Sequence, residues 1–261
     1  MLKSLIKLAL HPRRASFAPT EQVKPLIILG NGPSLNDTIA RERSALEDNP
    51  LLAVNFAANT PIFFELKPEY YVLADPHFFN NADDVNVKRL AASLDSVTWP
   101  MTLFVPFGSA APITNPHVSI EHFPMIAVEG ARKLESWAYS ARRGMPRPRN
   151  VLIPSIMIGV WLGFKEIYLA GADHSWMKTL SVTEQNEVVS VQPHFYADDT
   201  AELQRIRVTQ LNMQLHEQLW HWCVAFRSYH QIRRWTDKIG VRIYNATPGS
   251  FIDAFPRKCL K

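Results

Sequence analysis

The chain has 261 residues, of which 47% are hydrophobic and 20% charged, and its formal charge is +4. Such a length and composition fit one folded α/β-sized domain and exclude a disordered or collagen-like chain. The positive charge suits an acidic partner, but the sequence holds no zinc-finger spacing, RNA-recognition motif or long basic run, so we expect no nucleic acid. Cys223 and Cys259 form no CxxC pair, which favours the cytoplasm as a reducing compartment.

Residues 1–14 (MLKSLIKLALHPRR) predict a short amphipathic helix that ends at Pro12. Its apolar residues are Leu2, Leu5, Ile6, Ala9 and Leu10, and its basic residues include Lys3, Lys7, Arg13 and Arg14. This pattern is typical of docking on an anionic membrane surface, and packing on the chain's own domain or on a second subunit of a homo-oligomer explains it equally well. No stretch reaches the roughly 18–20 apolar residues of a membrane-spanning helix. We therefore expect a cytoplasmic protein that is at most peripheral on the inner face of the cytoplasmic membrane.

A linker over residues 15–25 leads into a single predicted domain over residues 26–261, which begins with the buried strand 26–29. The turn Gly30-Asn31-Gly32-Pro33-Ser34 follows this strand, and Ser34 or Asn36 is predicted to cap the next helix. The turn matches neither the dinucleotide GxGxxG motif nor the GxxxxGK[ST] phosphate loop. Asn31 carries two donors and an acceptor beside helix N–H groups, which suits a ribose or a phosphate; the alternative is a plain strand-to-helix turn.

Two further apolar runs, 51–54 and 70–74, end in Asn55 and in Asp75. Because the carboxyl ends of parallel strands meet at the ligand-binding edge of a sheet, we expect Asn31, Asn55 and Asp75 to gather at one rim.

The remaining elements complete an α/β pattern. Residues 106–149 are rich in Pro, Gly and Arg and predict a long irregular connection that serves as a lid. The other predicted elements are a strand at 102–105, a helix at 151–162 stopped by Gly163, a strand at 166–170, a long helix or helix pair at 201–235 and a strand at 241–245.

Four sequence blocks, LIILGNGPSL, AVNF, VLADPHFF and LGFKEIYLAGADHS, resemble the bacterial sialyltransferases of glycosyltransferase family 42. They are equally similar to the broader relatives, the motility-associated nonulosonate transferases and the MptE-like pyrophosphokinases. The matching regions are residues 26–79 and 150–200, with a weaker one at 241–256. The resemblance implies a Rossmann-like, GT-A-type variant fold with a mostly parallel sheet, a lid and a long C-terminal helix.

The same resemblance implies the site residues. The family's nucleotide-binding asparagines correspond to Asn31 and Asn55, and Asp75 stands where the sialyltransferases have a third. Their Gly-x-Asp-Phe-Tyr sequence reads Gly171-Ala172-Asp173-His174-Ser175 here, so the role of the tyrosine at the leaving phosphate falls to His174 or Ser175. The implied nucleotide site comprises Gly30, Asn31, Gly32, Ser34, Asn55, Asp75, Asp173 and Ser175.

Inverting glycosyl transfer needs a base, and the family's His-aromatic stretch corresponds to residues 192–196, which makes His194 the first choice and His174 its rival. Arg147 and Arg149, within a basic cluster, are expected to bind a carboxylate of the donor or acceptor. The acidic pairs at 83–84 and 198–199 offer a weaker case for a metal site.

These observations lead to one functional hypothesis and two alternatives. The first is a metal-independent glycosyltransferase that moves an acidic sugar (sialic acid, another nonulosonate or Kdo) from a CMP-sugar to a glycan or glycolipid acceptor of the cell surface. The second is an MptE-like pyrophosphokinase that uses ATP and Mg²⁺, with Asp75 and Asp173 as metal ligands. The third is a non-enzymatic, nucleotide-binding component docked on the membrane by residues 1–14.

Overall fold

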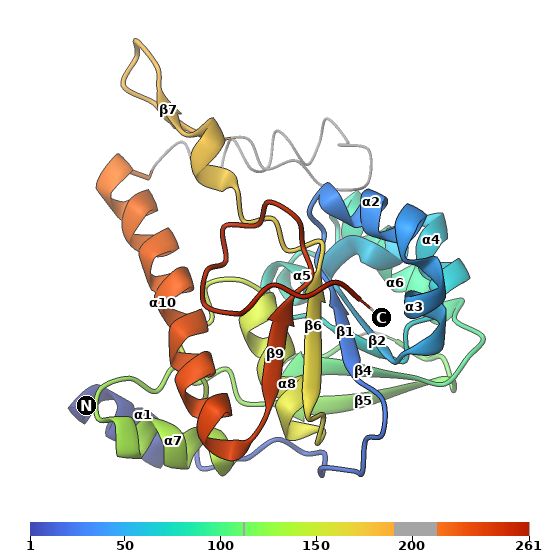
Figure 1. Ribbon diagram of the computed structural model, residues 1–261, viewed down its shortest axis with the longest axis horizontal. Coiled ribbons are helices and arrows are strands. Elements are labelled where there is room, and N and C mark those ends of the chain that lie inside the picture. The colour runs from blue at the N-terminus through green and yellow to red at the C-terminus, as the bar shows by residue number, and fades with distance from the viewer. Residues whose placement is uncertain (112, 191–212, 261) are drawn as a thin grey trace.

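The computed structural model describes residues 1–111, 113–190 and 213–260. Its centre is a parallel seven-stranded sheet in the order β5-β4-β3-β2-β1-β6-β9 (Figure 1). The strands of this sheet are β1 (Leu26–Leu29), β2 (Leu51–Val54), β3 (Tyr70–Val72), β4 (Met101–Pro106), β5 (Val118–Phe123), β6 (Glu166–Ala170) and β9 (Arg242–Asn245). A separate antiparallel pair joins β7 (Ser181–Val182) to β8 (Val188–Val189).

Helices cover both faces of the sheet. The α-helices of the described residues are α1 (Leu2–Leu10), α2 (Ser34–Arg41), α3 (Arg43–Asp48), α4 (Pro61–Leu66), α5 (His77–Asn80), α6 (Val85–Asp95), α7 (Arg132–Ser140), α8 (Leu152–Trp161) and α10 (Leu215–Ile239). Two short 3-10 helices are η1 (Asn55–Asn59) and η2 (Trp176–Thr179). In the described part of the chain no helix is both long and apolar enough to cross a bilayer.

The two faces of the sheet build separate apolar clusters because successive side chains of a strand point to opposite sides. Along β1, Leu26 and Ile28 join the cluster under α1, α7, α8 and α10, whereas Ile27 and Leu29 join the cluster under α2 and α3 (Figure 1). A third cluster packs α4 and α6 against β2, β3 and β4. The sequence-based prediction of a Rossmann-like α/β sheet flanked by helices, with a long C-terminal helix, is confirmed.

Helix boundaries follow local signals. All ten residues of α8 are buried, as its uninterrupted apolar sequence predicts, and Gly163 follows it with a φ of +102°. Helix α10 begins with a capping box between Gln214 and Glu217 and ends at Gly240, which has the left-handed conformation.

Two details of the sequence-based prediction are wrong. The segment 106–149 is not irregular throughout, because it contains the edge strand β5 and the helix α7. The polar residues Ser119 and Glu121 hide β5 in the sequence, since the strand pairs with β4 at the edge of the sheet. Ser34 does not cap α2 either: Pro33 occupies the N-cap, and the Ser34 hydroxyl donates to Asp173 instead.

The chain order reverses between β1 and β6, which makes this boundary the switch point of the sheet. The turns after these two strands touch through their backbones: Gly30 N donates to Ala170 O at 2.7 Å, and Gly32 N donates to Gly171 O at 2.9 Å. A Cβ on Gly32 would lie 1.9 Å from Asp173 Oδ2 and 2.7 Å from Gly171 O. The approach of the two turns therefore requires glycine at this position.

This contact predicts that a single methyl group added at Gly32 destabilises the fold measurably. We expect Gly32→Ala to lower the free energy of unfolding by about 2–3 kcal/mol, because the added Cβ overlaps a backbone carbonyl and a carboxylate. Gly108→Ala is the matched control: Gly108 has a φ of +87°, and no atom lies within 4 Å of the place that a Cβ would take there, so backbone strain alone should cost about 1 kcal/mol. Urea unfolding of both variants tests the claim, which fails if Gly32→Ala costs no more than Gly108→Ala.

Candidate functional site

A pocket of about 330 Å³ opens at the switch point of the sheet. This volume lies within the range of small-molecule sites, roughly 300–1,000 Å³. The turns after β1, β2, β3 and β6 form it together with the segment that enters α8. Its lining residues include Gly30, Asn31, Gly32, Asn55, Asp75, Met125, Arg149, Asn150, Leu152, Asp173, His174, Ser175 and Trp176. The expected gathering of Asn31, Asn55 and Asp75 at one rim is thus confirmed.

Asn31 and Asn55 present their amides at neighbouring strand ends. The Asn31 side chain donates from Nδ2 to Val54 O at 3.2 Å, which fixes the orientation of its amide. Asn55 has a φ of +53°, and its carbonyl accepts from the hydroxyl of the buried Tyr71 at 2.5 Å. Among the described residues neither Asn31 Oδ1 nor Asn55 Oδ1 has a hydrogen-bond donor, although both oxygens are buried. An unpaired buried acceptor is costly, and both residues line the pocket, so a small opening of the pocket around them would let a ligand supply the missing donors.

The two carboxylates of the pocket are each partly engaged. Asp75 Oδ1 accepts from the backbone N of His77 at 2.9 Å, which starts α5. Asp173 Oδ2 accepts from the Ser34 hydroxyl at 2.7 Å. Ser34 therefore contacts Asp173 without lining the pocket. The other predicted nucleotide-binding residues line the pocket directly.

His174 lies at the wall of the pocket within a buried hydrogen-bond network. Its Nε2 is 2.7 Å from the Tyr229 hydroxyl, which donates to Asn150 Oδ1 at 3.0 Å. Asn150 Nδ2 also lies 3.4 Å from His174 Nε2, so the direction of the hydrogen bonds at this nitrogen depends on the tautomer of His174. Burial lowers the pKa of His174 to about 3 and raises the pKa of Tyr229. His174 is therefore a weak base that stays neutral and ties the pocket to α10.

Trp176 and Asn150 are pocket residues that the sequence-based analysis missed. The Trp176 ring lies on that of His174 with a centroid separation of 4.2 Å, and it also approaches Trp222 of α10. Asn150 accepts from the backbone N of Leu152 at 3.1 Å and so orders the first turn of α8. An asparagine just before an apolar helical run is a typical start signal, which could have identified Asn150. No pattern in the sequence singles out Trp176.

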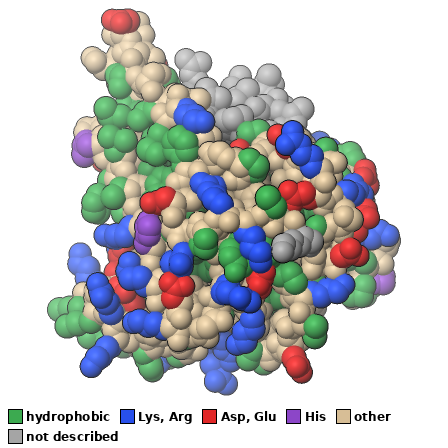
Figure 2. Space-filling model, in the orientation of Figure 1, with side chains coloured by type: hydrophobic (Ala, Val, Ile, Leu, Met, Phe, Trp, Pro, Cys, Tyr) green, Lys and Arg blue, Asp and Glu red, His purple; other side chains and the backbone are tan. Residues whose placement is uncertain are grey.

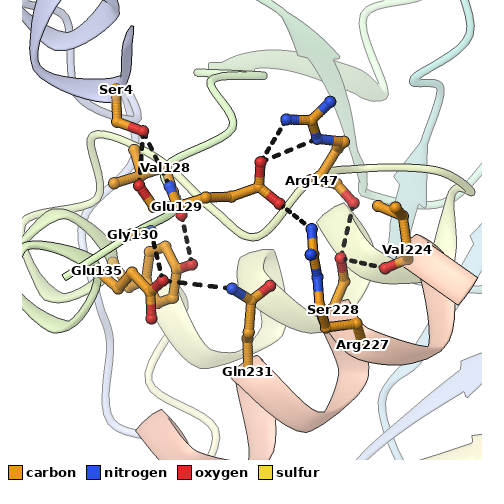
Figure 3. Close-up of polar contacts among 11 residues, drawn as sticks. Ser4, Val128, Glu129, Gly130, Glu135, Arg147, Val224, Arg227, Ser228 and Gln231 are labelled. Carbon is orange, nitrogen blue, oxygen red and sulfur yellow. Dashed lines mark hydrogen bonds and ion pairs between the residues drawn. The ribbon is translucent and has the colours of Figure 1, made fainter. Parts of the chain in front are cut away.

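The structure separates the two arginines that were expected to bind a carboxylate. Arg149 lines the pocket, and burial together with the nearby Arg147 lowers its pKa. Arg147 is not among the lining residues: its Nε donates to Glu129 Oε2 at 3.1 Å, and Arg227 pairs with the other oxygen of Glu129 (Figure 3). The carboxylate that Arg147 binds is thus an internal one.

In the described ranges, no group of three or more His, Cys, Asp or Glu side chains could hold a metal ion. Asp84 caps α6 by accepting from the backbone N of Asn86 and Val87, and Asp83 pairs with Lys88 on the surface. These contacts give both members of that acidic pair structural roles. His194 and the pair at 198–199 lie outside the described residues.

The fold and the pocket define a Rossmann-like protein with a pocket of small-molecule size at its switch point. No protein-family model matches the chain, and no curated protein matches it. Among solved structures, the chain is similar to a MAf glycosyltransferase from Magnetospirillum magneticum AMB-1, with 13% sequence identity and a TM-score of 0.49. The similarity covers 94% of this chain and 34% of that one, so this chain spans about a third of the length of that structure.

The burial of His174 predicts acid sensitivity. Its pKa of about 3 in the folded state lies below the ordinary value of 6.5, so between these values the unfolded state binds more protons and stability falls as the pH falls. Replacing His174 with Gln keeps a polar side chain that can hydrogen-bond to Tyr229 and removes the titration. Between about pH 7 and about pH 4, wild type should lose about 2–3 kcal/mol more stability than His174→Gln.

Denaturant unfolding over this pH range measures the difference, and His216→Gln is the control because His216 is exposed on α10. Parallel pH profiles of wild type and His174→Gln would contradict the assignment.

Proposed function

We propose that this protein is a glycosyltransferase whose pocket binds the nucleotide of a CMP-sugar and from which an acidic sugar passes to a glycan or glycolipid acceptor. One observation carries the proposal: hydrogen-bond acceptors on Asn31, Asn55 and Asp75 share a single pocket with the cation Arg149 and the start of α8. A nucleotide needs both kinds of group, because its ribose hydroxyls donate hydrogen bonds and its phosphate is an anion.

The acceptor side of the pocket suits the nucleoside. Asn31 Oδ1 and Asn55 Oδ1 are without donors among the described residues, and the ribose hydroxyls or the amino group of cytosine would provide them. Asp75 has one oxygen beyond the one that accepts from His77, and a carboxylate accepts well from ribose hydroxyls. The resemblance of these strand ends to the sialyltransferase blocks favours CMP over other nucleotides.

The cationic side of the pocket suits the phosphate. Arg149 offers a guanidinium fork, and α8 directs the positive end of its dipole toward the pocket through Asn150, Val151 and Leu152. In glycosyl transfer the nucleotide is the leaving group, so groups that stabilise its growing negative charge accelerate the reaction. Ser175 lines the same pocket and adds a hydroxyl donor.

The base that deprotonates the acceptor is assigned to His194 on the resemblance of residues 192–196 to the family's stretch. His174 is the weaker choice, because its pKa is about 3 and its Nε2 is bonded to Tyr229. An imidazole with so low a pKa takes a proton poorly near neutral pH. We assign to His174 the positioning of Trp176 and Asn150 at the wall of the pocket.

A pyrophosphokinase remains the second candidate because Asp75 and Asp173 line one pocket. Each carboxylate keeps an oxygen outside the contacts to His77 and Ser34, and Mg²⁺ bound to ATP often uses one or two protein carboxylates. The donor set fits such an ion only in part, since no group of three or more His, Cys, Asp or Glu side chains among the described residues could hold a metal ion.

Nucleotide binding distinguishes the candidates. CMP at about 100 times its Kd should raise the stability by about 2.7 kcal/mol without metal if the transferase proposal is right. Stabilisation by ATP only with Mg²⁺ would favour the kinase, and no response to CMP, UDP, GDP or ATP would favour a non-enzymatic component. Thermal unfolding with each nucleotide measures this.

Removing one of the acceptors should weaken CMP directly. We expect Asn31→Ala to lower CMP affinity about tenfold, which corresponds to about 1.4 kcal/mol, close to one hydrogen bond. Calorimetric titration is the measurement, because the loss of the bond to Val54 also lowers the stability of the ligand-free protein. Gln185→Ala is the control, since its amide is exposed on the turn between β7 and β8; equal affinities of the two variants would remove Asn31 from the site.

The kcat values of variants at His194 and His174 should differ. His194→Ala should lower kcat with a CMP-sialic acid donor by about a hundredfold or more, while CMP affinity is kept, because a general base acts on the acceptor. His174→Gln should keep most of the turnover. Unchanged turnover of His194→Ala, or a loss confined to His174→Gln, would transfer the role of base to His174.

A further inference from the structure

Helix α1 presents its apolar residues to solvent. Leu2 and Leu10 are each 71% exposed, Ile6 is 50% exposed and Leu5 is 45% exposed, whereas Ser4 and Leu8 are buried. A helix that served only its own domain would bury its apolar residues and expose the serine. Here most of the apolar residues are exposed, and the serine is buried together with Leu8.

Helical geometry shows how far the two faces diverge. At about 100° per residue, Ser4 and Leu8 point in nearly the same direction, and the centre of the apolar stripe lies about 150° away from them. The apolar stripe consists of Leu2, Leu5, Ile6, Ala9 and Leu10. It therefore points away from the domain on which the helix is packed.

The helix is held firmly despite this exposure. The Ser4 hydroxyl donates to Glu129 O at 2.9 Å and accepts from Glu129 N at 3.0 Å (Figure 3), and Arg143 donates to the carbonyl of Leu8 at 3.2 Å. These contacts fix α1 through its polar and buried side. The apolar stripe is therefore already ordered before it meets a partner.

Basic residues and an exposed tryptophan lie near α1. Lys3 and Lys7 project along one edge of the stripe by the same helical geometry. Trp137 of α7 is 50% exposed, and the Arg143 guanidinium lies 5.4 Å from its ring centroid. Hydrophobic and basic side chains gather on the side of the molecule where α1 and α7 lie (Figures 1 and 2). Tryptophan and lysine are the residues that mark membrane–water interfaces.

We propose that α1 inserts this apolar stripe into the surface of an anionic lipid bilayer, with Lys3 and Lys7 at the headgroups. The sign of the charge favours lipid over a second copy of the chain, because an antiparallel two-fold contact through α1 would place the lysines of both helices along the same edge. The stripe of one nine-residue helix is also small beside the roughly 800 Å² per partner of a stable protein interface. A bilayer accepts such a stripe at any lateral position, and its anionic headgroups neutralise the lysines.

Vesicle sedimentation with the full chain tests the proposal. The protein should sediment with vesicles of phosphatidylcholine mixed with phosphatidylglycerol, sediment far less with phosphatidylcholine alone, and dissociate as the salt concentration rises. The double variant Leu5→Ser/Ile6→Ser should bind the mixed vesicles at least about tenfold more weakly, because two inserted side chains are lost. Lys3→Glu/Lys7→Glu should also weaken binding, and this loss should shrink at high salt.

Val23→Ser/Val85→Ser is the matched control, since these two side chains are 93% and 79% exposed elsewhere on the surface. All variants replace exposed residues, and an unchanged melting temperature verifies the fold. Equal sedimentation of wild type and Leu5→Ser/Ile6→Ser would overturn the proposal, as would an absence of binding to anionic vesicles. A wild-type dimer in light scattering that Leu5→Ser/Ile6→Ser dissociates would assign the stripe to self-association instead. These measurements do not involve CMP, so their outcome does not depend on the proposed transferase activity.

Discussion

The backbone contact between the turns after β1 and β6 is the constraint on which the pocket depends. Gly30, Gly32 and Gly171 allow the two turns to approach so closely that a Cβ on any of them would overlap a carbonyl oxygen. The approach brings Ser34 within hydrogen-bonding distance of Asp173, and it sets the start of α2 beside the end of β6. Because glycine backbone without side chains forms this junction, the polar side chains of neighbouring positions line the pocket.

Another part of the pocket wall is fixed by a buried hydrogen-bond network. His174 has a φ of +51° and bonds to Tyr229 of α10, which in turn bonds to Asn150 before α8. A single buried network thus joins β6, α8 and α10 around one side of the pocket. Since an unpaired member would be costly at this depth, the network specifies one arrangement of the three elements.

The sequence predicts the features that local chemistry determines, and it does not predict those that depend on contacts between distant residues. Buried runs that end in Asn55 and Asp75 predict both the parallel sheet and its polar rim, because strand direction fixes where those residues meet. The edge strand β5 is missed because its exposed side carries polar residues that resemble a loop. The pairing of Arg147 with Glu129 links residues 18 positions apart, and no periodic pattern reports such a pair. Similarly, an amphipathic pattern locates α1 but does not say which of its faces meets the domain.

Glu129 connects the exposed helix to the pocket by charge as well as by position. Its backbone holds Ser4 of α1, while its carboxylate binds both Arg147 and Arg227 (Figure 3). One carboxylate between two guanidinium groups leaves this region with excess positive charge, and Arg149 adds to it at the pocket. Because Glu129 is engaged by its two partners, it does not neutralise Arg149 through an ion pair. Arg149, whose pKa is lowered by burial and Arg147 and raised by Glu129, lines the pocket and would favour an anionic ligand there.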